Sequence, residues 1–539
     1  MAKRDPTLGE RLMYVFSPDK ANKAYRKRVA GTPVKKAPKM SYGNHGASRT
    51  LNSMVGWIVN GGSAEEDIDE HGAMLRKRAR DLYTGGGLAR SGPQALTTAV
   101  VGWGILPKPK VDSALLGLTD EQAEEAERAI LREFKLWAEN PFCDAERQRN
   151  YYEMQQLAFL SMLMSGDVFA LFGEKDNRRT PYRLTVRLLE ADRISTPDSG
   201  GESEVADTDG GGRIVDGVEL DPDGTVVRYH IASRHPLSSA STTELVWTAV
   251  DAFGKDTGEP NILHIMTHER PEQRRGVPFV AAEIELLKQL DRYLKSELTA
   301  NLVASMFSVF LESTEDDASA GLEDVINEED KVTSEDNLYE LGPGVVIDLP
   351  FGKKVQAVNP TRNNSTFDKY VEAMETVIGS SMGIPKEVLV SKYERNYTAA
   401  RAALLDFWRT VRVYRTRFNA SFNQPIYEQW LAEAVALGRI DAPGFFDDPA
   451  VRQAWCGCIW TGASMGHVDP LKEVNAAAAR IANNISTQEQ EASEFNGNDW
   501  AANVRQRRKE INAMKDLMTD LAAFADMPEE EKEDEEDEP

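Results

Sequence analysis

The chain has 539 residues, of which 41% are hydrophobic and 28% are charged, a composition typical of a folded globular protein with several domains. It carries 63 Lys and Arg against 87 Asp and Glu, a formal net charge of −24. A surface this acidic argues against a high-affinity nucleic-acid binder, because neutralising phosphates requires a basic surface. Three cysteines cannot form a disulfide scaffold, and no run of 18 apolar residues occurs, so we expect no membrane span and assembly in a reducing cytoplasm.

The charge is distributed in blocks. Residues 1–40 hold 11 Lys and Arg against three acids, residues 312–340 hold 12 acids against one Lys, and residues 526–539 hold 10 acids against one Lys. The two ends are therefore expected to be solvated, disordered tails. The sequence leaves open whether the basic arm 1–40 grips phosphate or is only a solvated leader.

Periodicity divides the rest of the chain into helical and strand regions. Helices are expected over 65–83, 95–101, 119–140 and 150–164, with Thr119 and Gln122 forming a capping box at the start of the third. Antiparallel strands are expected at 168–172, 182–189, 213–220, 226–232 and 262–266, and a loop at 195–212.

The second half returns to helical spacing. A helix is expected from about residue 280 to 305, then strands at 306–311, 345–349 and 354–358, and a helix over 367–382 that Gly383 and Pro385 end. Residues 385–397 are expected to be an irregular polar connector. The longest helix begins near Thr398, and Pro425 should kink it by removing a backbone hydrogen bond. Its many aromatic residues require a neighbouring helix or subunit to cover them.

Motifs of enzyme chemistry are sparse. No Walker A sequence and no His-Glu-x-x-His occurs, and no cofactor or metal site is predicted. Residues 462–466 (GASMG) match the nucleophile-elbow pattern, so a serine hydrolase using Ser464 is one alternative, although His467 would be its only downstream histidine. The other alternative is a DNA-binding adaptor that forms no ring and uses the basic arm.

One polar constellation combines basic and aromatic side chains between two helices, a combination able to touch a phosphate backbone. Its members are Lys386, Lys392, Tyr393, Arg395, Asn396, Tyr397 and Arg401. A solvated connector of ordinary kind explains the same residues, and the sequence alone leaves both readings open.

A set of segments in fixed order resembles the portal proteins of tailed bacteriophages, specifically the lambda family. The segments are Leu75–Leu82 (LRKRARDL), Val100–Ile105 (VVGWGI), Ser165–Ala170 (SGDVFA), Val215–Asp221 (VDGVELD), Ile262–Ile265 (ILHI), Arg275–Pro278 (RGVP), Asn396–Arg409 (NYTAARAALLDFWR) and Trp460 with Val468–Glu473 (VDPLKE). The resemblance covers about residues 40–520. Gly85–Gly87 departs from it, because relatives usually have Asn-Asn-Pro there.

The resemblance implies a non-enzymatic, mainly helical α+β fold that closes into a ring, typically of twelve copies, at one capsid vertex of the virion. It implies a channel through which double-stranded DNA passes non-specifically. Its partners would be the large terminase subunit, a head–tail adaptor, the major capsid or scaffolding protein, and further copies of the chain.

The family architecture is mapped onto the chain as follows: a basic N-terminal arm at 1–40, a wing of helices and antiparallel strands at 41–277, a first stem helix at 278–305, an α/β clip at 306–360, a second stem helix at 361–383, a tunnel loop at 384–397, a long kinked wing helix at 398–437, a helical crown at 438–520 and an acidic disordered tail at 521–539. Under this mapping the polar constellation, now the tunnel loop and its flank, is expected to face DNA.

Overall fold

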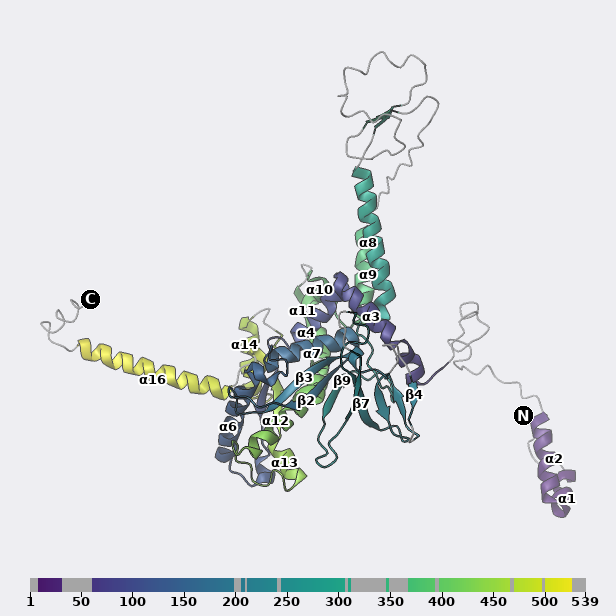
Figure 1. Ribbon diagram of the computed structural model, residues 1–539, viewed down its shortest axis with the longest axis horizontal. Coiled ribbons are helices and arrows are strands. Elements are labelled where there is room, and N and C mark those ends of the chain that lie inside the picture. Colours follow the sequence, from purple (N-terminus) through teal and green to yellow (C-terminus); the bar gives the residue numbers. More distant parts are fainter. Residues whose placement is uncertain are drawn as a thin grey trace, which may run out of the picture. The chain divides into compact units, whose positions relative to one another are not determined.

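The computed structural model describes residues 8–31, 61–197, 205–208, 211–239, 244–305, 309–311, 346–348, 367–392, 397–465, 470–496 and 500–525. The chain divides into two compact units, residues 1–62 and 63–539. Within the described residues the fold is α+β and mainly helical, as the sequence predicts (Figure 1).

The first unit contains two helices, α1 (Leu8–Phe16) and α2 (Pro18–Gly31), which contact each other. The expectation of a disordered arm is therefore wrong for residues 8–31. Leu8, Leu12 and Val15 recur at the helical period along α1, and this short periodicity was hidden in the sequence by the surrounding charge.

The main core of the second unit is helical. The first helices of this unit are the π-helical turn η2 (Glu65–Asp69), α3 (Glu70–Gly85) and α4 (Leu88–Val100). They are followed by α5 (Ser113–Leu116), α6 (Asp120–Ala138), the short 3-10 helix η3 (Pro141–Cys143) and α7 (Tyr151–Ser165). Capping boxes start α6 at Thr119 and α7 at Asn150, which confirms the predicted Thr119–Gln122 pair. The second helix begins seven residues earlier than predicted, because Gly86 and Gly87 adopt positive φ and turn the chain.

Two antiparallel sheets follow. The first has the order β3-β2-β9, from β2 (Asp167–Glu174), β3 (Leu184–Glu190) and β9 (Ile262–Met266), and it packs against the helical core. The second has the order β4-β5-β6-β7-β8, from β4 (Val205–Asp207), β5 (Arg213–Val215), β6 (Val218–Leu220), β7 (Val226–Ala232) and β8 (Trp247–Asp251). A 3-10 helix, η4 (Ala191–Arg193), leads from the first sheet to the second.

Three expectations about these strands are wrong. The single strand 213–220 is a hairpin, because Asp216 and Gly217 both take positive φ in a two-residue turn. The expected loop 195–212 contains β4, and β8 was not predicted at all. The sequence of β8 is short and half-exposed, so its alternation gives little signal.

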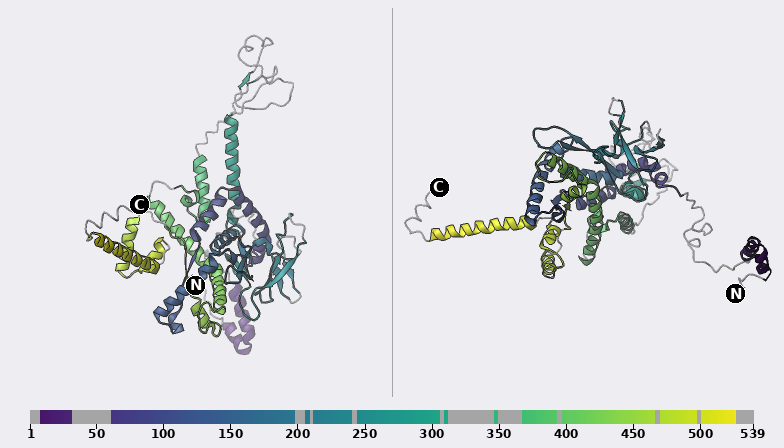
Figure 2. Two further views of the ribbon diagram at one scale, coloured as in Figure 1. Left: turned by 60° about the vertical axis from the view of Figure 1, so that its left-hand side comes forward. Right: turned by 90° about the horizontal axis from the view of Figure 1, so that it is seen from below.

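Two helices, α8 (Ile284–Ser305) and α9 (Phe367–Ser381), run side by side, as Figures 1 and 2 show. The 3-10 helix η5 (Ala281–Glu283) precedes α8. Tyr293 stacks on Phe367 with ring centroids 5.8 Å apart and contacts Tyr370 at 4.8 Å, which holds the pair together. The short strands β10 (Val309–Leu311) and β11 (Val346–Asp348) pair in parallel, and the predicted strand 354–358 lies outside the described residues.

The connector after α9 is less irregular than expected. Gly383, with φ of 65°, does end α9, but α10 (Lys386–Val390) is helical and buries Leu389. The long helix starts as α11 (Tyr397–Phe418), passes through a π-helical segment, η7 (Asn419–Asn423), and continues as α12 (Gln424–Ala436). Pro425 lies in the first turn of α12, so the helix is irregular directly before the proline rather than at it.

The aromatic face of this long helix is largely covered by the chain itself. Phe418, Phe422, Ile426 and Trp430 are buried against α6 and α7, and Trp430 meets Phe134 edge-on at 4.9 Å. Helices α6 and α7 of the same chain therefore bury this part of the aromatic face, and no neighbouring subunit is needed there.

The C-terminal part contains α13 (Pro449–Trp455), β12 (Cys458–Thr461), α14 (Pro470–Ala482), α15 (Gln488–Asn496) and α16 (Trp500–Ala525). Strand β12 pairs with β1 (Leu106–Pro109), a long-range contact that the sequence did not indicate. Because α16 extends to Ala525, the expectation of disorder is wrong for residues 521–525, and residues 526–539 lie outside the described part of the chain.

Candidate functional site

The predicted tunnel loop is described up to Lys392. Lys386 begins α10 and pairs with Glu372 of α9, and this hydrogen bond, together with the nearby charges of Lys386 and Lys392, lowers the pKa of the Glu372 carboxyl. Lys392 is exposed at the end of the described segment. The connector thus presents one lysine that is tied to α9 and another that reaches solvent.

The other predicted residues are only partly described. Tyr393, Arg395 and Asn396 lie outside the described residues, and of Tyr397 only its place as the first residue of α11 is given. Arg401 pairs with Glu473 of α14 at 3.2 Å, so it links α11 to the C-terminal helices. Among the described members, Lys386 and Lys392 both lie near Glu372, whereas Arg401 pairs with a different helix.

The GASMG segment has a packing role in the structure. A Cβ on Gly462 would lie 2.8 Å from Nε of Arg415, and that guanidinium donates to the carbonyl oxygens of Ala99, Val100 and Ala463. A side chain at residue 462 would displace this guanidinium from its carbonyl acceptors, so the first glycine of the motif has a packing explanation without any catalysis. Ser464 follows β12 without leading directly into a helix, and His467 lies outside the described residues.

No group of His, Cys, Asp and Glu able to hold a metal ion occurs in the described part of the chain. None of the described helices is both long enough and apolar enough to cross a membrane. Cys143 and Cys456 are buried, and burial raises the pKa of each thiol to about 12, which keeps both protonated and unreactive at neutral pH.

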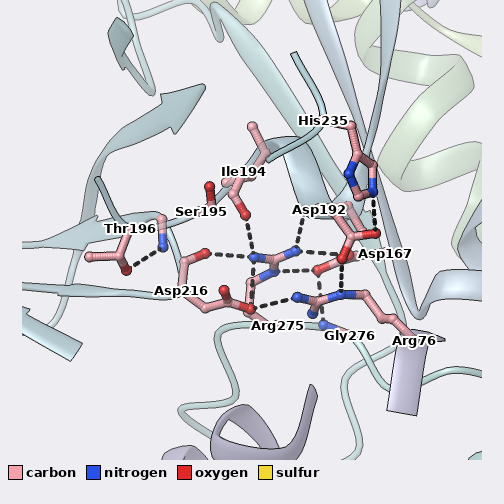
Figure 3. Close-up of polar contacts among 12 residues, drawn as sticks. Arg76, Asp167, Asp192, Ile194, Ser195, Thr196, Asp216, His235, Arg275 and Gly276 are labelled. Carbon is pink, nitrogen blue, oxygen red and sulfur yellow. Dashed lines mark hydrogen bonds and ion pairs between the residues drawn. The ribbon is translucent and has the colours of Figure 1, made fainter. Parts of the chain in front are cut away.

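The most elaborate polar site is a buried ion network centred on Arg275, shown in Figure 3. Its Nε donates to Oδ2 of Asp167 at 2.7 Å, and its Nη1 lies 3.0 Å from Oδ2 of Asp216. The same guanidinium donates to the carbonyl oxygens of Ala191, Ile194 and Asp216 at 2.7, 2.8 and 2.5 Å. A guanidinium is suited to this position because its planar fork offers five donors.

A second arginine extends the network. Arg76 of α3 donates from Nε to Asp192 at 3.0 Å and from Nη2 to Asp216 at 3.2 Å. Arg80, one turn further along α3, also pairs with Asp192, and His235 approaches the same carboxylate at 3.5 Å. The network therefore ties α3 to η4, to the β5–β6 turn and to the start of β2.

Two glycines allow the backbone around Arg275 to pack tightly. A Cβ on Gly276 would lie 2.0 Å from the carbonyl oxygen of Gly166, so neither chain segment could carry a side chain here. The amide of Gly276 donates to Asp167 at 3.1 Å, and Nε2 of His264 lies 3.2 Å from the same carboxylate.

The sequence analysis missed this network as a site. Arg76, Asp167, Asp216 and Arg275 each lie in one of the segments that carry the family resemblance, and that shared membership is the signal that could have found them. Which of these residues pair with one another could not be predicted from the sequence, because they are between 49 and 199 positions apart.

The network makes folding sensitive to acid. Burial opposes the charge of Asp167, but Arg275 and His264 outweigh it and hold the pKa of that carboxyl well below its usual range. Arg76 and Arg80 likewise lower the pKa of Asp192, and burial lowers the pKa of His264. Asp167, Asp192 and His264 all bind protons more weakly in the folded state than in the unfolded state. Each therefore contributes its full stabilisation at pH values above its unfolded pKa.

We therefore expect the urea midpoint to fall as the pH drops. The His264 contribution is lost below about pH 6.5, the unfolded pKa of histidine, and the aspartate contributions are lost below about pH 3.9. Urea titrations monitored by circular dichroism at pH 7.5, 5.5 and 3.0 would measure this, and Asp251→Asn, which lies outside the network on half-exposed β8, should show the same fall. A midpoint that rises with acidification would contradict the assignment.

Comparison with known proteins places this chain in a family. Residues 50–415 match the family model described as phage portal protein, lambda family. The chain is 24% identical to portal protein B of Escherichia phage lambda, over 80% of this chain and 82% of the relative. It is 23% identical to the portal protein of Escherichia phage N15, over 87% and 89% of the two chains.

The class is thus that of bacteriophage portal proteins, structural head–tail connector components of the virion that serve DNA packaging and ejection. The chain belongs to the lambda family of phage portal proteins.

Solved structures of low similarity include the neck of an empty gene transfer agent particle computed with C6 symmetry, at a TM-score of 0.36 and 14% identity over 71% of this chain and 93% of that one. Another is the neck of the native particle computed with C12 symmetry, at a TM-score of 0.36 and 11% identity over 78% and 92%.

Proposed function

We propose that identical copies of this chain, typically twelve, close into a ring at the unique capsid vertex and form the channel for DNA. Terminase would drive DNA in through this channel during packaging, and the genome would leave through it into the tail. The ring would contact the large terminase subunit, a head–tail adaptor, and the major capsid or scaffolding protein. Assembly would take place in the cytoplasm of the bacterial host.

The observation that carries this proposal is the exposed apolar side of the α8–α9 pair. Leu294, Leu298 and Leu302 recur every four residues on α8 and are all exposed, Leu298 to 71%. Tyr370 and Val377 of α9 are also exposed. Large apolar side chains that recur on the exposed side of a helix indicate an interaction surface, so these helices favour cover by neighbouring copies. A closed cyclic ring supplies such neighbours on both sides of each copy.

The net charge supports a conduit rather than a clamp. Each copy carries −24, and duplex DNA carries one negative charge per roughly 1.7 Å of its axis. Repulsion between an acidic wall and the duplex keeps DNA from adhering to the wall, so that it can slide. A small number of basic side chains, such as Lys392, would then steady the DNA without binding it tightly.

Purified full-length protein imaged by electron microscopy tests the ring directly. We expect closed rings with a central opening, with a mass by mass photometry that is a whole-number multiple of 59.9 kDa. Monomers alone under assembly conditions would overturn the proposal and favour the DNA-binding adaptor that forms no ring.

The connector has a separate prediction. Replacing Lys392 and Arg395 together by alanine should reduce the amount of DNA packaged or retained while rings still assemble, because the change removes positive charge facing the duplex. DNA filling of particles, measured by protected genome length, would show this. The control Lys135→Ala/Lys255→Ala removes two exposed lysines outside the connector and should fill normally. Normal filling in the connector variant would refute its DNA-facing role.

A further inference from the structure

Helix α16 is long and is not packed into the described body of the chain. It spans 26 residues, Trp500–Ala525, and every side chain described between Ala502 and Met518 is exposed. The exposed set includes large apolar residues, among them Met514 at 60% and Met518 at 70%. A helix in water gains most of its stability from packing an apolar face, so this one requires a partner.

Six large apolar residues of α16 and one arginine recur at alternating steps of four and three. The positions are Trp500, Val504, Arg507, Ile511, Met514, Met518 and Leu521, and the apolar Leu517 flanks them. The mean step of 3.5 residues is the heptad repeat of a coiled coil, in which this seam faces another helix. Only Arg507 interrupts the seam, and its charge is paired with Glu510 at 3.5 Å within the same helix.

The other side of the helix is polar and faces the chain's own body. Arg505 lies 3.9 Å from Glu124 of α6, and Lys509 and Asn512 lie on this same side by their heptad positions. The seam is therefore directed away from α6. What covers it must come from outside the described part of this copy.

The charges flanking the seam indicate the orientation of the partner. In a parallel pair, each residue on one flank meets the residue five positions later on the opposite flank of its neighbour. Glu510 and Lys515 stand in that relation, so parallel copies of α16 would pair opposite charges. An antiparallel pair would instead bring Arg508 and Lys515, which share one flank, against the same residues of the partner.

We propose that α16 packs in parallel, through this seam, against α16 of a neighbouring copy. Cyclic symmetry keeps equivalent helices parallel, whereas a two-fold dimer can also oppose them. The proposal rests on the ring of the proposed function and adds a second, C-terminal contact between its copies, distinct from the α8–α9 surface.

Cysteine cross-linking in the full chain tests the pairing. Met514→Cys places a thiol in the seam, and mild oxidation should yield a covalently linked dimer in severalfold excess over Lys509→Cys, which lies on the polar side. The wild-type protein measures the background cross-linking through Cys458, the one native thiol that is partly exposed. Electron microscopy of the same samples reports ring formation independently.

The outcomes separate the two proposals. Rings in which Met514→Cys links no better than Lys509→Cys would overturn the α16 pairing and leave the ring intact. Absence of rings from wild type would overturn the proposed function, and severalfold linking at residue 514 would then still support the pairing.

The stability of the assembly towards urea provides a second test of the α16 pairing. Arg507→Leu completes the seam and should raise the urea concentration at which copies dissociate, whereas Lys509→Leu should not. An Arg507→Leu midpoint no higher than that of Lys509→Leu would also overturn the pairing.

Discussion

Replacing Arg275 by methionine should lower the free energy of unfolding by roughly 3–5 kcal/mol, the cost of breaking a buried ion pair on one side. Methionine keeps much of the length of the side chain, so the main loss is electrostatic. Asp167 would remain fully buried without its nearest cation, and three backbone carbonyls would lose their donor. Urea unfolding monitored by circular dichroism would measure the change.

Two controls make this prediction specific to the network. Arg228→Met removes an arginine whose side chain is 44% exposed and pairs with Glu219 and Asp251, and it should lower the midpoint much less than Arg275→Met. Adding Asp167→Asn to Arg275→Met removes the stranded charge and should recover part of the loss. If the double variant is less stable by the full sum of its two single changes, the two groups are not coupled as the geometry requires.

Replacing Trp430 by alanine should cost about 3–5 kcal/mol, the usual range for removing a large aromatic side chain from a core. Trp430 is fully buried among Phe134, Tyr182 and Tyr427, with ring centroids 4.9, 5.6 and 5.9 Å away. Because the cover comes from α6 and the strand region of the same chain, the loss should appear in monomers and in assembled protein alike.

Trp103 provides the matched control, since it is 64% exposed in the turn after α4. Trp103→Ala should change stability by no more than about 0.5 kcal/mol, as surface substitutions usually do. A Trp430→Ala variant that is destabilised only when copies assemble would show that the aromatic face of the long helix is covered by a neighbour instead.

Local sequence signals were sufficient where an element depends on its own residues. The capping box at Thr119, the strand 262–266 and the end of α9 at Gly383 were all predicted, because each is set by side chains within a few positions. The amphipathic spacing of α8 and α9 was equally clear. Signals weakened where charge or turn chemistry competed, as in α1, in the β5–β6 hairpin and in α10.

For the candidate site, the sequence supplied residue types but not their partners. Lys386 and Lys392 do lie on the connector, but the sequence could not show that Lys386 is tied to Glu372 or that Arg401 is tied to Glu473. The Arg275 network needed five segments of the chain to converge, namely α3, the start of β2, η4, the β5–β6 turn and the segment of Arg275, and no local pattern encodes such a meeting.

By itself the sequence determined the mainly helical α+β class, the acidic balance, and the family through its ordered segments. Only the tertiary structure decided which apolar faces are covered by the chain's own residues, as around Trp430, and which remain exposed, as on α8 and α16. The physical reason is that periodicity reports that a face must be buried, while the partner that buries it depends on long-range packing. The same holds for buried charges, whose partners are chosen by the fold.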